Sequence, residues 1–425
     1  MDILVEPSEY RFLNAGDSAM TQVAISRLCA MWPEAHVQVL TSHPELLPAY
    51  SARVVPLAHT GRVLWSNERW VPARFARSHV RIIQSWSRAL SIQQPGIFRS
   101  LRGLRYRHRD PSQGDKIETF LSVMSHAELF VVAGMGGLTS AFHDYSVMVL
   151  NTLALAQTYK VPTVLFGQGI GPFDPGLQEQ ARRVLSKVDY ITLREGRYGP
   201  SLLREWGVPE DRWSVTGDDA IELAFRDHRE STGSAIGVNL RLASYSAVTE
   251  SIASNLREPL QQIARSLGAP LRAIPISRLP DEADAMQAEI LFEGYDLVEY
   301  PDSPIDTPLG VIEELKHCRL LLTGSYHAGV FALAQGIPVI GLAVSEYYQW
   351  KFNGLAHQFG EGCRVLRLGT PGASRALQEM IGELWNRAPD LRAALLSAAQ
   401  RQRDASRDAY HHVFAMLAKR PAGQR

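Results

Sequence analysis

Short apolar runs alternate along this chain with longer segments of helical periodicity, and this alternation constrains the fold more than any other feature. The runs "MDILVEP", "AHVQVLTS", "VPTVLFGQGIGP" and "DYITLRE" read as buried strands, and helices are expected between them, near residues 18–31, 143–159 and 176–187. Strands that alternate with helices form parallel sheets, because a parallel connection needs a long crossover. The sequence therefore predicts an α/β fold with Rossmann-like, doubly wound sheets.

A polar stretch divides this pattern into two sets. The segment "RDHRESTGS" (226–234) combines charged and turn-forming residues without an apolar period, which is typical of a linker. Before it we predict an N-terminal Rossmann-like domain, residues 1–228, with a basic helical insertion near 60–115. After it we predict a C-terminal Rossmann-like domain, residues 233–373, and helices in 374–425 that pack back across both domains. A length of 425 residues agrees with two domains facing a cleft.

Composition narrows the classes of function. Lys and Arg together number 44, as do Asp and Glu, so the basic excess of a typical nucleic-acid binder is missing and we expect no nucleic-acid partner. The three cysteines, Cys29, Cys318 and Cys363, fit no metal or disulfide spacing and suit a reducing compartment. The first residues lack signal-peptide character, and no run approaches the roughly 20 apolar residues of a spanning helix. We expect a cytoplasmic protein.

Four glycine-bearing loops follow predicted strands of the first domain: "NAGDSA" (14–19), "AGMGG" (133–137), "GQGIGP" (167–172) and "GDD" (217–219). In such sheets ligands bind beyond the carboxyl ends of the strands, and glycine lets the backbone approach a ligand closely. Strand–helix turns also use glycine for structural reasons, so the loops predict a cleft but not its chemistry. The candidate binding residues in them are Asn14, Gly16, Asp17, Gly136, Gly137, Gln168, Gly169 and Asp218.

Cationic side chains also stand at predicted strand ends. Arg194 ends "DYITLRE" and Arg241 ends "AIGVNLR", so both are expected to face the cleft. A guanidinium binds a carboxylate or a phosphate through two parallel hydrogen bonds, which suits an anionic substrate. The alternative is an interdomain salt bridge with Glu195 or Asp218. Lys351, on a later helix, is a weaker candidate, for which a solvated position is the simpler interpretation.

The stretch "LLTGSYHAGVFALAQGIPVIGL" (321–342) places a histidine between a strand and a helix. A helix N-terminus disfavours the imidazolium, so His327 could act as a base or as a neutral donor near pH 7. The alternative is a packed histidine at the helix start, where Ser325 would already serve as the cap. Tyr326 could stack on a sugar or simply pack. The residues alone leave both interpretations open.

The ordered set of motifs resembles the polysaccharide pyruvyl transferase family. "NAGDSAM", "AGMGGL…HD", "GQGIGPF", "VTGDDAIEL", "GVNLR" and the stretch around His327 appear in the family's order, from about residue 10 to 360. The resemblance implies a GT-B-like arrangement of two Rossmann-like halves. It also implies transfer of a pyruvyl group from phosphoenolpyruvate to a sugar of a cell-surface polysaccharide or its lipid-linked precursor, without a metal or another cofactor.

The same resemblance implies roles for three residues and exposes one departure. Arg194 and Arg241 would hold the carboxylate and phosphate of phosphoenolpyruvate, and His327 would be the general acid. Family members commonly carry an arginine two residues before this histidine, and here the position is Ser325. Serine cannot replace a bidentate cation. Either Arg278 or Lys351 supplies the charge, or the donor differs.

A basic segment fits no part of this pattern. Residues 62–109 contain eleven arginines and one acid, Glu68, interleaved with Trp65, Trp70 and Trp86. A solvated or lid-like helical insertion is the simpler interpretation. The more specific interpretation is a surface that binds the acceptor. The same surface could also contact the inner face of a membrane, because apolar and cationic groups together favour the membrane interface.

Three hypotheses follow for the function. The first is the pyruvyl transferase. The second is a nucleotide-sugar-dependent GT-B glycosyltransferase, favoured by Ser325, and the third is a non-catalytic member that acts as a binding partner. The acceptor sugar and the oligomeric state are not predicted.

Overall fold

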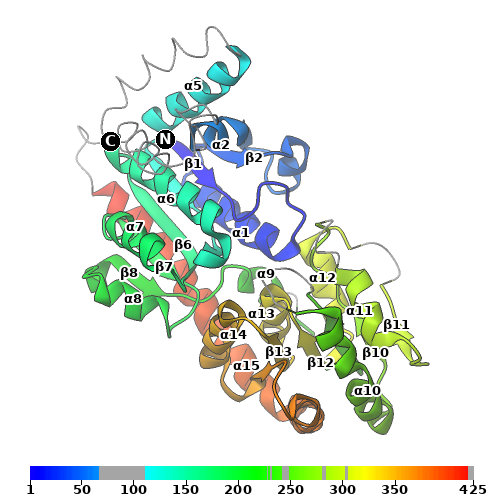
Figure 1. Cartoon of the computed structure of the whole chain (residues 1–425). Coiled ribbons are helices and arrows are strands. Elements are labelled where there is room, and N and C mark those ends of the chain that lie inside the picture. Colours follow the sequence, from blue (N-terminus) through cyan, green and yellow to red (C-terminus); the bar gives the residue numbers. More distant parts are fainter. Residues whose placement is uncertain are drawn as a thin grey trace, which may run out of the picture.

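The structure is a computed structural model that describes residues 1–66, 111–226, 228–229, 232–241, 248–279, 284–301 and 305–419. Two parallel sheets form two lobes, which Figure 1 shows at the upper left and the lower right. The predicted fold class, two Rossmann-like halves, is confirmed. None of the helices in the described part combines the length and the apolar character of a membrane span.

The N-terminal lobe is built on a sheet with the order β3-β2-β1-β4-β6-β7-β8, in which β5 also pairs with β6. The chain order reverses between β1 and β4, and such a switch point is where a doubly wound sheet opens a crevice for ligands. The strands are β1 (Asp2–Glu6), β2 (His36–Thr41), β3 (Val54–Ala58), β4 (Leu129–Val132), β5 (Met135–Leu138), β6 (Thr163–Ile170), β7 (Tyr190–Leu193) and β8 (Trp213–Val215). The helices are α1 (Ala15–Met31), α2 (Thr60–Ser66), α5 (Pro111–His126), α6 (His143–Thr158), α7 (Pro175–Leu185), α8 (Gly199–Glu205) and α9 (Ile221–Arg226).

The C-terminal lobe has a second parallel sheet with the order β11-β10-β9-β12-β13-β14, and its switch point lies between β9 and β12. The strands are β9 (Ala235–Asn239), β10 (Leu271–Ala273), β11 (Val298–Glu299), β12 (Cys318–Thr323), β13 (Val339–Ala343) and β14 (Cys363–Arg367). The helices are α10 (Glu250–Leu267), α11 (Asp284–Phe292), α12 (Pro308–Leu315), α13 (Tyr326–Ala334) and α14 (Glu346–Phe359).

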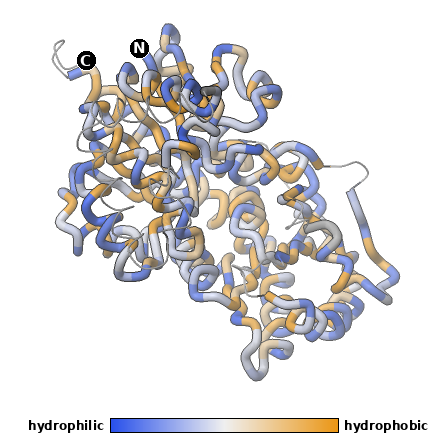
Figure 2. Tube along the Cα trace, turned by 45° about the horizontal axis from the view of Figure 1, so that its top comes forward, coloured by the Kyte–Doolittle hydropathy of each residue, from blue (hydrophilic) through white to orange (hydrophobic). Residues whose placement is uncertain are grey.

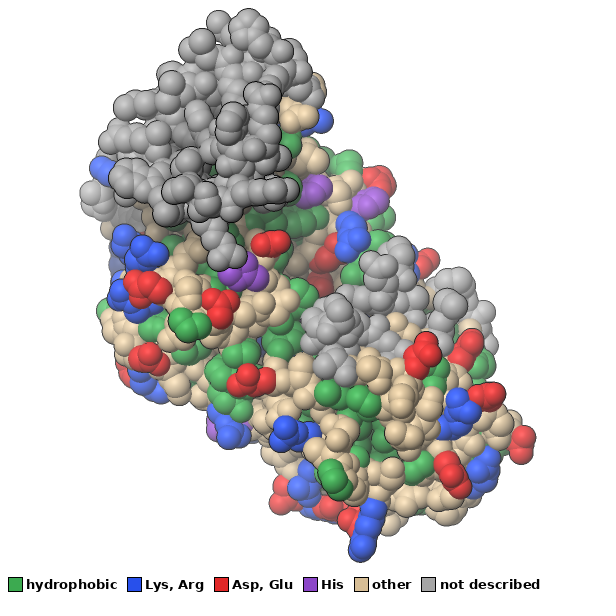
Figure 3. Space-filling model, viewed as in Figure 1, with side chains coloured by type: hydrophobic (Ala, Val, Ile, Leu, Met, Phe, Trp, Pro, Cys, Tyr) green, Lys and Arg blue, Asp and Glu red, His purple; other side chains and the backbone are tan. Residues whose placement is uncertain are grey.

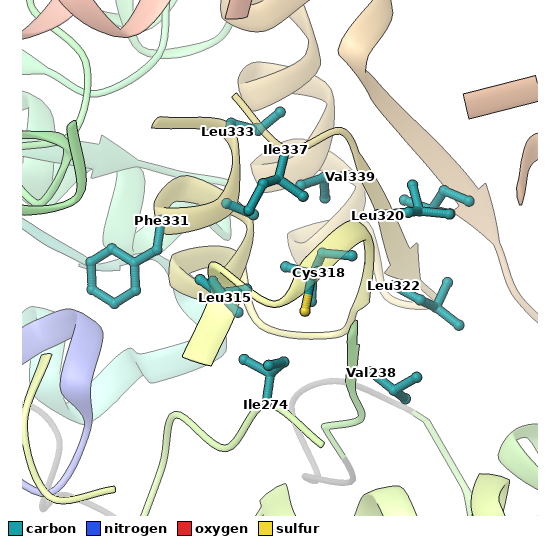
Figure 4. Close-up of a cluster of buried hydrophobic side chains, with 14 of the residues drawn as sticks. Val238, Ile274, Leu315, Cys318, Leu320, Leu322, Phe331, Leu333, Ile337 and Val339 are labelled. Carbon is teal, nitrogen blue, oxygen red and sulfur yellow. The ribbon is translucent and has the colours of Figure 1, made fainter. Parts of the chain in front are cut away.

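Helices cover the central strands of both sheets, so these strands are buried along most of their length. The residues of β4, β7, β9 and β13 are all buried, and Figure 2 shows the hydrophobic segments inside each lobe. In the C-terminal lobe the Cys318 thiol packs among side chains such as Val238, Ile274 and Leu315 (Figure 4). Burial raises the pKa of Cys318 to about 12, so this thiol is an inert part of the core.

The tail of the chain differs from the prediction of several helices. Residues Ala373–Ala418 form one helix, α15, which continues through Pro389 because its apolar stripe of Leu384, Leu391 and Leu395 keeps packing on both sides of the proline. This helix contacts α10, α13 and β12 in the C-terminal lobe, and α9, α1 and β7 in the N-terminal lobe (Figure 1). It therefore connects the two sheets along its length.

Two predicted glycine loops are strands in the structure. Gly136 and Gly137 belong to β5, and Gln168 and Gly169 belong to β6, which runs on to Ile170. The reason is additional pairing, since β5 adds to one side of β6 and β7 pairs with its other side as far as Gln168. The glycines among these residues therefore leave room for neighbouring side chains at the site. They do not offer the site the backbone amides of a helix N-terminus.

Most of the predicted basic segment, residues 67–110, lies outside the described residues. At its near edge the interpretation as a surface is wrong for two residues on α2. Arg62 is fully buried and donates to the Glu6 carboxylate and the Tyr10 hydroxyl, and Trp65 packs against Phe120. A buried carboxylate needs a cation beside it, and this requirement draws Arg62 into the core.

Candidate active site

A cavity of about 640 Å³ lies between the lobes, and its lining comes from strand ends of both sheets. Figure 3 shows the recess between the lobes on one face of the molecule. Ten of the predicted site residues line this cavity. They are Asn14, Asp17, Gly136, Gly137, Arg194, Arg241, Ser325, Tyr326, His327 and Lys351.

His327 is placed by the junction between β12 and α13. Thr323, the last residue of β12, accepts the amide of Ser325 at its Oγ1 (2.9 Å), and Gly324 donates its amide to the Asn239 carbonyl (2.8 Å). Ser325 occupies the N-cap position of α13, but its side chain accepts no capping hydrogen bond. The expected capping role is therefore wrong, and Ser325 is one of the residues that line the cavity.

The ring of His327 lies directly against the first turn of α1, in the other lobe. A Cβ added to Gly16 would come within 2.1 Å of His327 Cγ and 2.2 Å of Nδ1. Only glycine fits there, so the glycine of "NAGDSA" makes room for the histidine. The two lobes are joined at this point by backbone hydrogen bonds from Ala15 to the Ile276 carbonyl and from Arg278 to the Leu13 carbonyl.

Asp218 lies behind the cavity, between a histidine and an arginine. Its Oδ2 is 3.7 Å from His327 Nε2 and 3.7 Å from Arg194 Nη1, and the three side chains are buried. Burial alone would raise the pKa of Asp218, but His327, Arg194 and the Ala220 amide together hold it below its usual value. An ionised carboxylate therefore stands near both the Arg194 guanidinium and the His327 imidazole.

Arg194 is fixed by its surroundings. Its guanidinium lies 4.0 Å above the Tyr326 ring, and a Cβ on Gly136 would approach Nη2 to 2.3 Å. Its ion-pair partner is Asp218 of the same lobe, so the predicted alternative of an interdomain bridge does not hold. Glu195 is used elsewhere, because its carboxylate accepts the amides of residues 197–199 at the start of α8.

Lys351 is not a solvated surface lysine. Its Nζ lies 4.1 Å from the centre of the Tyr347 ring, 5.3 Å from that of Tyr348 and 5.9 Å from that of Tyr326. Aromatic faces attract cations, and three of them hold the ammonium group at the cavity. The Tyr347 hydroxyl also donates to the Gly136 carbonyl (2.8 Å), which connects α14 to the N-terminal lobe.

Comparison with known proteins supports the family resemblance of the sequence. The family model for polysaccharide pyruvyl transferase matches residues 14–346. The chain belongs to this family. It is accordingly an enzyme, and the cavity is its candidate active site. Among curated proteins, none matches the sequence significantly.

Solved structures similar to this family member show the fold. A putative UDP-N-acetylglucosamine 2-epimerase from Listeria monocytogenes aligns with a TM-score of 0.55 at 11% identity, covering 99% of this chain and 97% of that one. UDP-GlcNAc 2-epimerase from Neisseria meningitidis aligns with 0.54 at 14%, covering 99% and 100%. Anabaena Alr3699/HepE in complex with UDP aligns with 0.55 at 12%, covering 99% and 100%. The fold is GT-B-like.

Four of the predicted site residues of this pyruvyl transferase family member lie outside the cavity lining. Gly16 packs on His327, Gly169 packs on Arg194, and Asp218 stands behind both of these side chains. Gln168 is fully buried, and its Nε2 donates to the carbonyls of Ala133 and Phe166 within the sheet. Three of the four therefore support the cavity from behind, and Gln168 fastens β6 to the end of β4.

Two other predicted residues, both in the first turn of α1 or just before it, line the cavity. Asn14 lines the cavity, and its Oδ1 accepts the amides of Gly16 (3.0 Å) and Asp17 (3.3 Å) as the N-cap of α1. Burial raises the pKa of Asp17, although His327, Lys351 and Arg194 act in the opposite direction. Burial is the largest of these effects, so the pKa of Asp17 lies above its usual value.

The prediction from sequence missed the part of the cavity that is lined by residues after the first three strands. Tyr10, Ser42, His43 and His59 line it, after β1, β2 and β3. The strand-end rule could have found them, because each stands shortly after an apolar run. Among the described residues, no group of three His, Cys, Asp or Glu side chains is arranged to hold a metal ion.

Proposed function

We propose that this enzyme transfers the pyruvyl group of phosphoenolpyruvate to hydroxyl groups of a sugar, as a ketal, in a cell-surface polysaccharide or its lipid-linked precursor. The observation that carries the proposal is that Arg194, Arg241 and Lys351 line one cavity together with His327. Phosphoenolpyruvate bears a carboxylate and a phosphate on the same carbon. Such a compact anion needs several cations close together, and guanidinium groups suit both of its anionic parts.

The charges around the cavity favour an anionic donor. Asp218 is ionised but already lies between Arg194 and His327, and Asp17 has a raised pKa. Arg241, two residues after β9, has an exposed fraction of only 4%, so water screens its charge weakly. Positive charge in a partly closed cavity attracts phosphate and carboxylate more strongly than the same charge on an open surface.

The chemistry assigns the proton transfer to His327. A proton added to the methylene carbon converts it to a methyl group and leaves positive charge on the carbon that bears the carboxylate. A sugar hydroxyl oxygen bonds to that carbon, the bond from the carbon to the phosphate oxygen breaks, and a second hydroxyl of the sugar closes the ketal. Of the two hydroxyl protons released, one balances the proton taken up by the methyl group and the other leaves on inorganic phosphate. A placed general acid typically contributes about 10² to 10⁴ in rate.

Lys351 takes the place of the cation that Ser325 cannot supply. Both residues line the cavity, and three tyrosine rings hold the Lys351 ammonium there. Arg278, the other candidate, is exposed and pairs with Asp306 at 3.0 Å. Of the two residues considered from the sequence, Lys351 is therefore the one that can reach the donor.

Thermal unfolding with a panel of ligands tests the donor. A ligand at about 100 times its dissociation constant adds roughly 2.7 kcal/mol of stability, which is readily measured. Phosphoenolpyruvate should raise the melting temperature more than inorganic phosphate or a uridine diphosphate sugar. Stabilisation by the nucleotide sugar alone would support instead a glycosyltransferase, a second candidate suggested by the similar fold of Anabaena Alr3699/HepE in complex with UDP.

Transfer of ¹⁴C from labelled phosphoenolpyruvate tests the reaction. The acceptor is the glycan fraction of a strain of the source organism that lacks this gene, since that fraction contains the unmodified natural acceptor. His327→Ala should lose transfer while keeping its melting temperature. The matched control is His126→Ala, at the exposed end of α5, which should transfer like the wild type. An active His327→Ala protein would refute the role of the histidine.

A further inference from the structure

The cavity extends beyond the cationic residues to a wall that the proposed reaction does not use. This wall comes from the segments after β1, β2 and β3, and it contains a stacked pair of aromatic side chains, the Tyr10–His59 surface, in which one ring backs the other. The rings of Tyr10 and His59 are stacked, with centroids 4.9 Å apart and an angle of 18° between their planes. Both residues line the same cavity as Arg194 and His327.

The position of His59 in the sheet separates it from the residues that would hold the donor. His59 follows β3 and Arg194 follows β7, and β2, β1, β4 and β6 lie between these strands. At about 4.8 Å per strand, the two strand ends are separated by about 24 Å. The Arg194 side chain extends back towards Gly136 of β5, so the side chains come closer together than the strand ends. His59 nevertheless follows the edge strand β3, and a ligand on its ring is a different part of the substrate from the group held by Arg194.

Charges near the Tyr10–His59 surface are compensated among the described residues. Arg11 Nε is 3.0 Å from Glu9 Oε1, and His43 Nδ1 is 2.8 Å from Glu45 Oε1. Burial lowers the pKa of His59, and the charges of Arg62 and His43 lower it further against the effects of the Thr41 carbonyl and Glu9. The imidazole is therefore neutral near pH 7. An uncharged ligand fits this wall better than a phosphate.

A buried cluster holds the aromatic surface in place. The Tyr10 hydroxyl donates to the Glu6 carboxylate, and Arg62 donates to both. The backbone of His59 is fixed by its amide, which donates to the Thr41 carbonyl (3.1 Å), and by its carbonyl, which accepts the Val63 amide (3.0 Å). A surface that is already ordered loses little entropy when a ligand binds, and aromatic rings offer a large rigid contact area.

We infer that the Tyr10–His59 surface binds an uncharged sugar ring of the acceptor, at least one unit away from the sugar that receives the pyruvyl group. The inference rests on the proposed function, and it makes the acceptor an oligosaccharide rather than a single sugar. The ring lies with its apolar face on the aromatic surface, while the reacting sugar lies beside the donor near Arg194 and His327.

The test compares three proteins in the ¹⁴C transfer assay with the same glycan fraction. His59→Ala removes the flat surface, and His59→Phe keeps a flat ring. We expect the alanine variant to raise the KM for the acceptor about tenfold, the scale of an aromatic contact. Its KM for phosphoenolpyruvate should stay unchanged, and His59→Phe should remain within about threefold of the wild type for both.

The outcomes separate the inference from the proposed function. If the wild-type protein transfers no label, the proposed function fails. If it transfers label and His59→Ala keeps the wild-type KM for the acceptor, or raises the KM for phosphoenolpyruvate instead, the subsite is overturned while the function stands. If His59→Ala melts at a lower temperature than the wild type, His59→Gln takes its place in the assay. The KM for the acceptor and the KM for phosphoenolpyruvate then decide in the same way.

Discussion

The contact between Gly16 and His327 leads to the sharpest prediction. In Gly16→Ala the added methyl group would lie 2.1 Å from His327 Cγ and 2.2 Å from both Cβ and Nδ1. Ordinary van der Waals contacts begin near 3.4 Å, so the ring or α1 has to move by more than 1 Å. Because Cβ is among the contacting atoms, rotating the ring does not relieve the clash, and we expect the start of α13 to shift together with His327.

The size of the effect on stability follows from two opposing terms. Replacing glycine by alanine in a helix stabilises it by about 0.5–1 kcal/mol. Overpacking a buried contact costs about 1–3 kcal/mol. The variant should therefore be less stable than the wild type by about 0–2.5 kcal/mol, and it should stay folded.

The effect on turnover should be much larger. A displacement of about 1 Å in a catalytic group can cost about 10²-fold in rate. We expect Gly16→Ala to lose about 10²-fold in kcat for the transfer of ¹⁴C from phosphoenolpyruvate to the glycan fraction. Stability is measured alongside by urea denaturation.

Gly382→Ala is the matched control. Gly382 lies inside α15, and a Cβ there meets nothing within 4 Å. This variant should gain about 0.5–1 kcal/mol and keep its turnover. If Gly16→Ala gained stability like the control and turned over like the wild type, the placement of His327 against α1 would be refuted.

Three further predictions concern charged groups of the core and the cavity. Arg62→Met leaves the Glu6 carboxylate buried without its cation and should cost about 3–5 kcal/mol in urea denaturation, most of which the double variant with Glu6→Leu should restore. Because the folded pKa of Asp17 is raised, the wild type loses stability as pH rises from about 4 through that pKa, so Asp17→Asn should become progressively the more stable protein over this interval. A constant difference from pH 4 to 8 would contradict this. Lys351→Met should weaken binding of phosphoenolpyruvate about tenfold or more by calorimetry, and an unchanged affinity would exclude the lysine from the donor site.

The sequence by itself determined the fold class and the strand-end residues. The alternation of apolar runs and helical periods is a local property, because burial under helices on both faces makes a parallel strand apolar along its length. The same pattern fixes the carboxyl end of each strand. It therefore placed Arg194, Arg241 and His327 at the edge where a ligand binds, and the ordered motifs identified the family.

Other features depended on contacts between residues far apart in the chain. Gly136 and Gly16 look like turn glycines, but their missing side chains leave room for Arg194 and His327. Arg62 looks like part of a basic surface and is drawn inside by Glu6, 56 residues away. The sequence shows which side chains are charged and which are large. Only the tertiary structure decides which of them meet, because packing and the compensation of buried charge are settled between elements rather than within them.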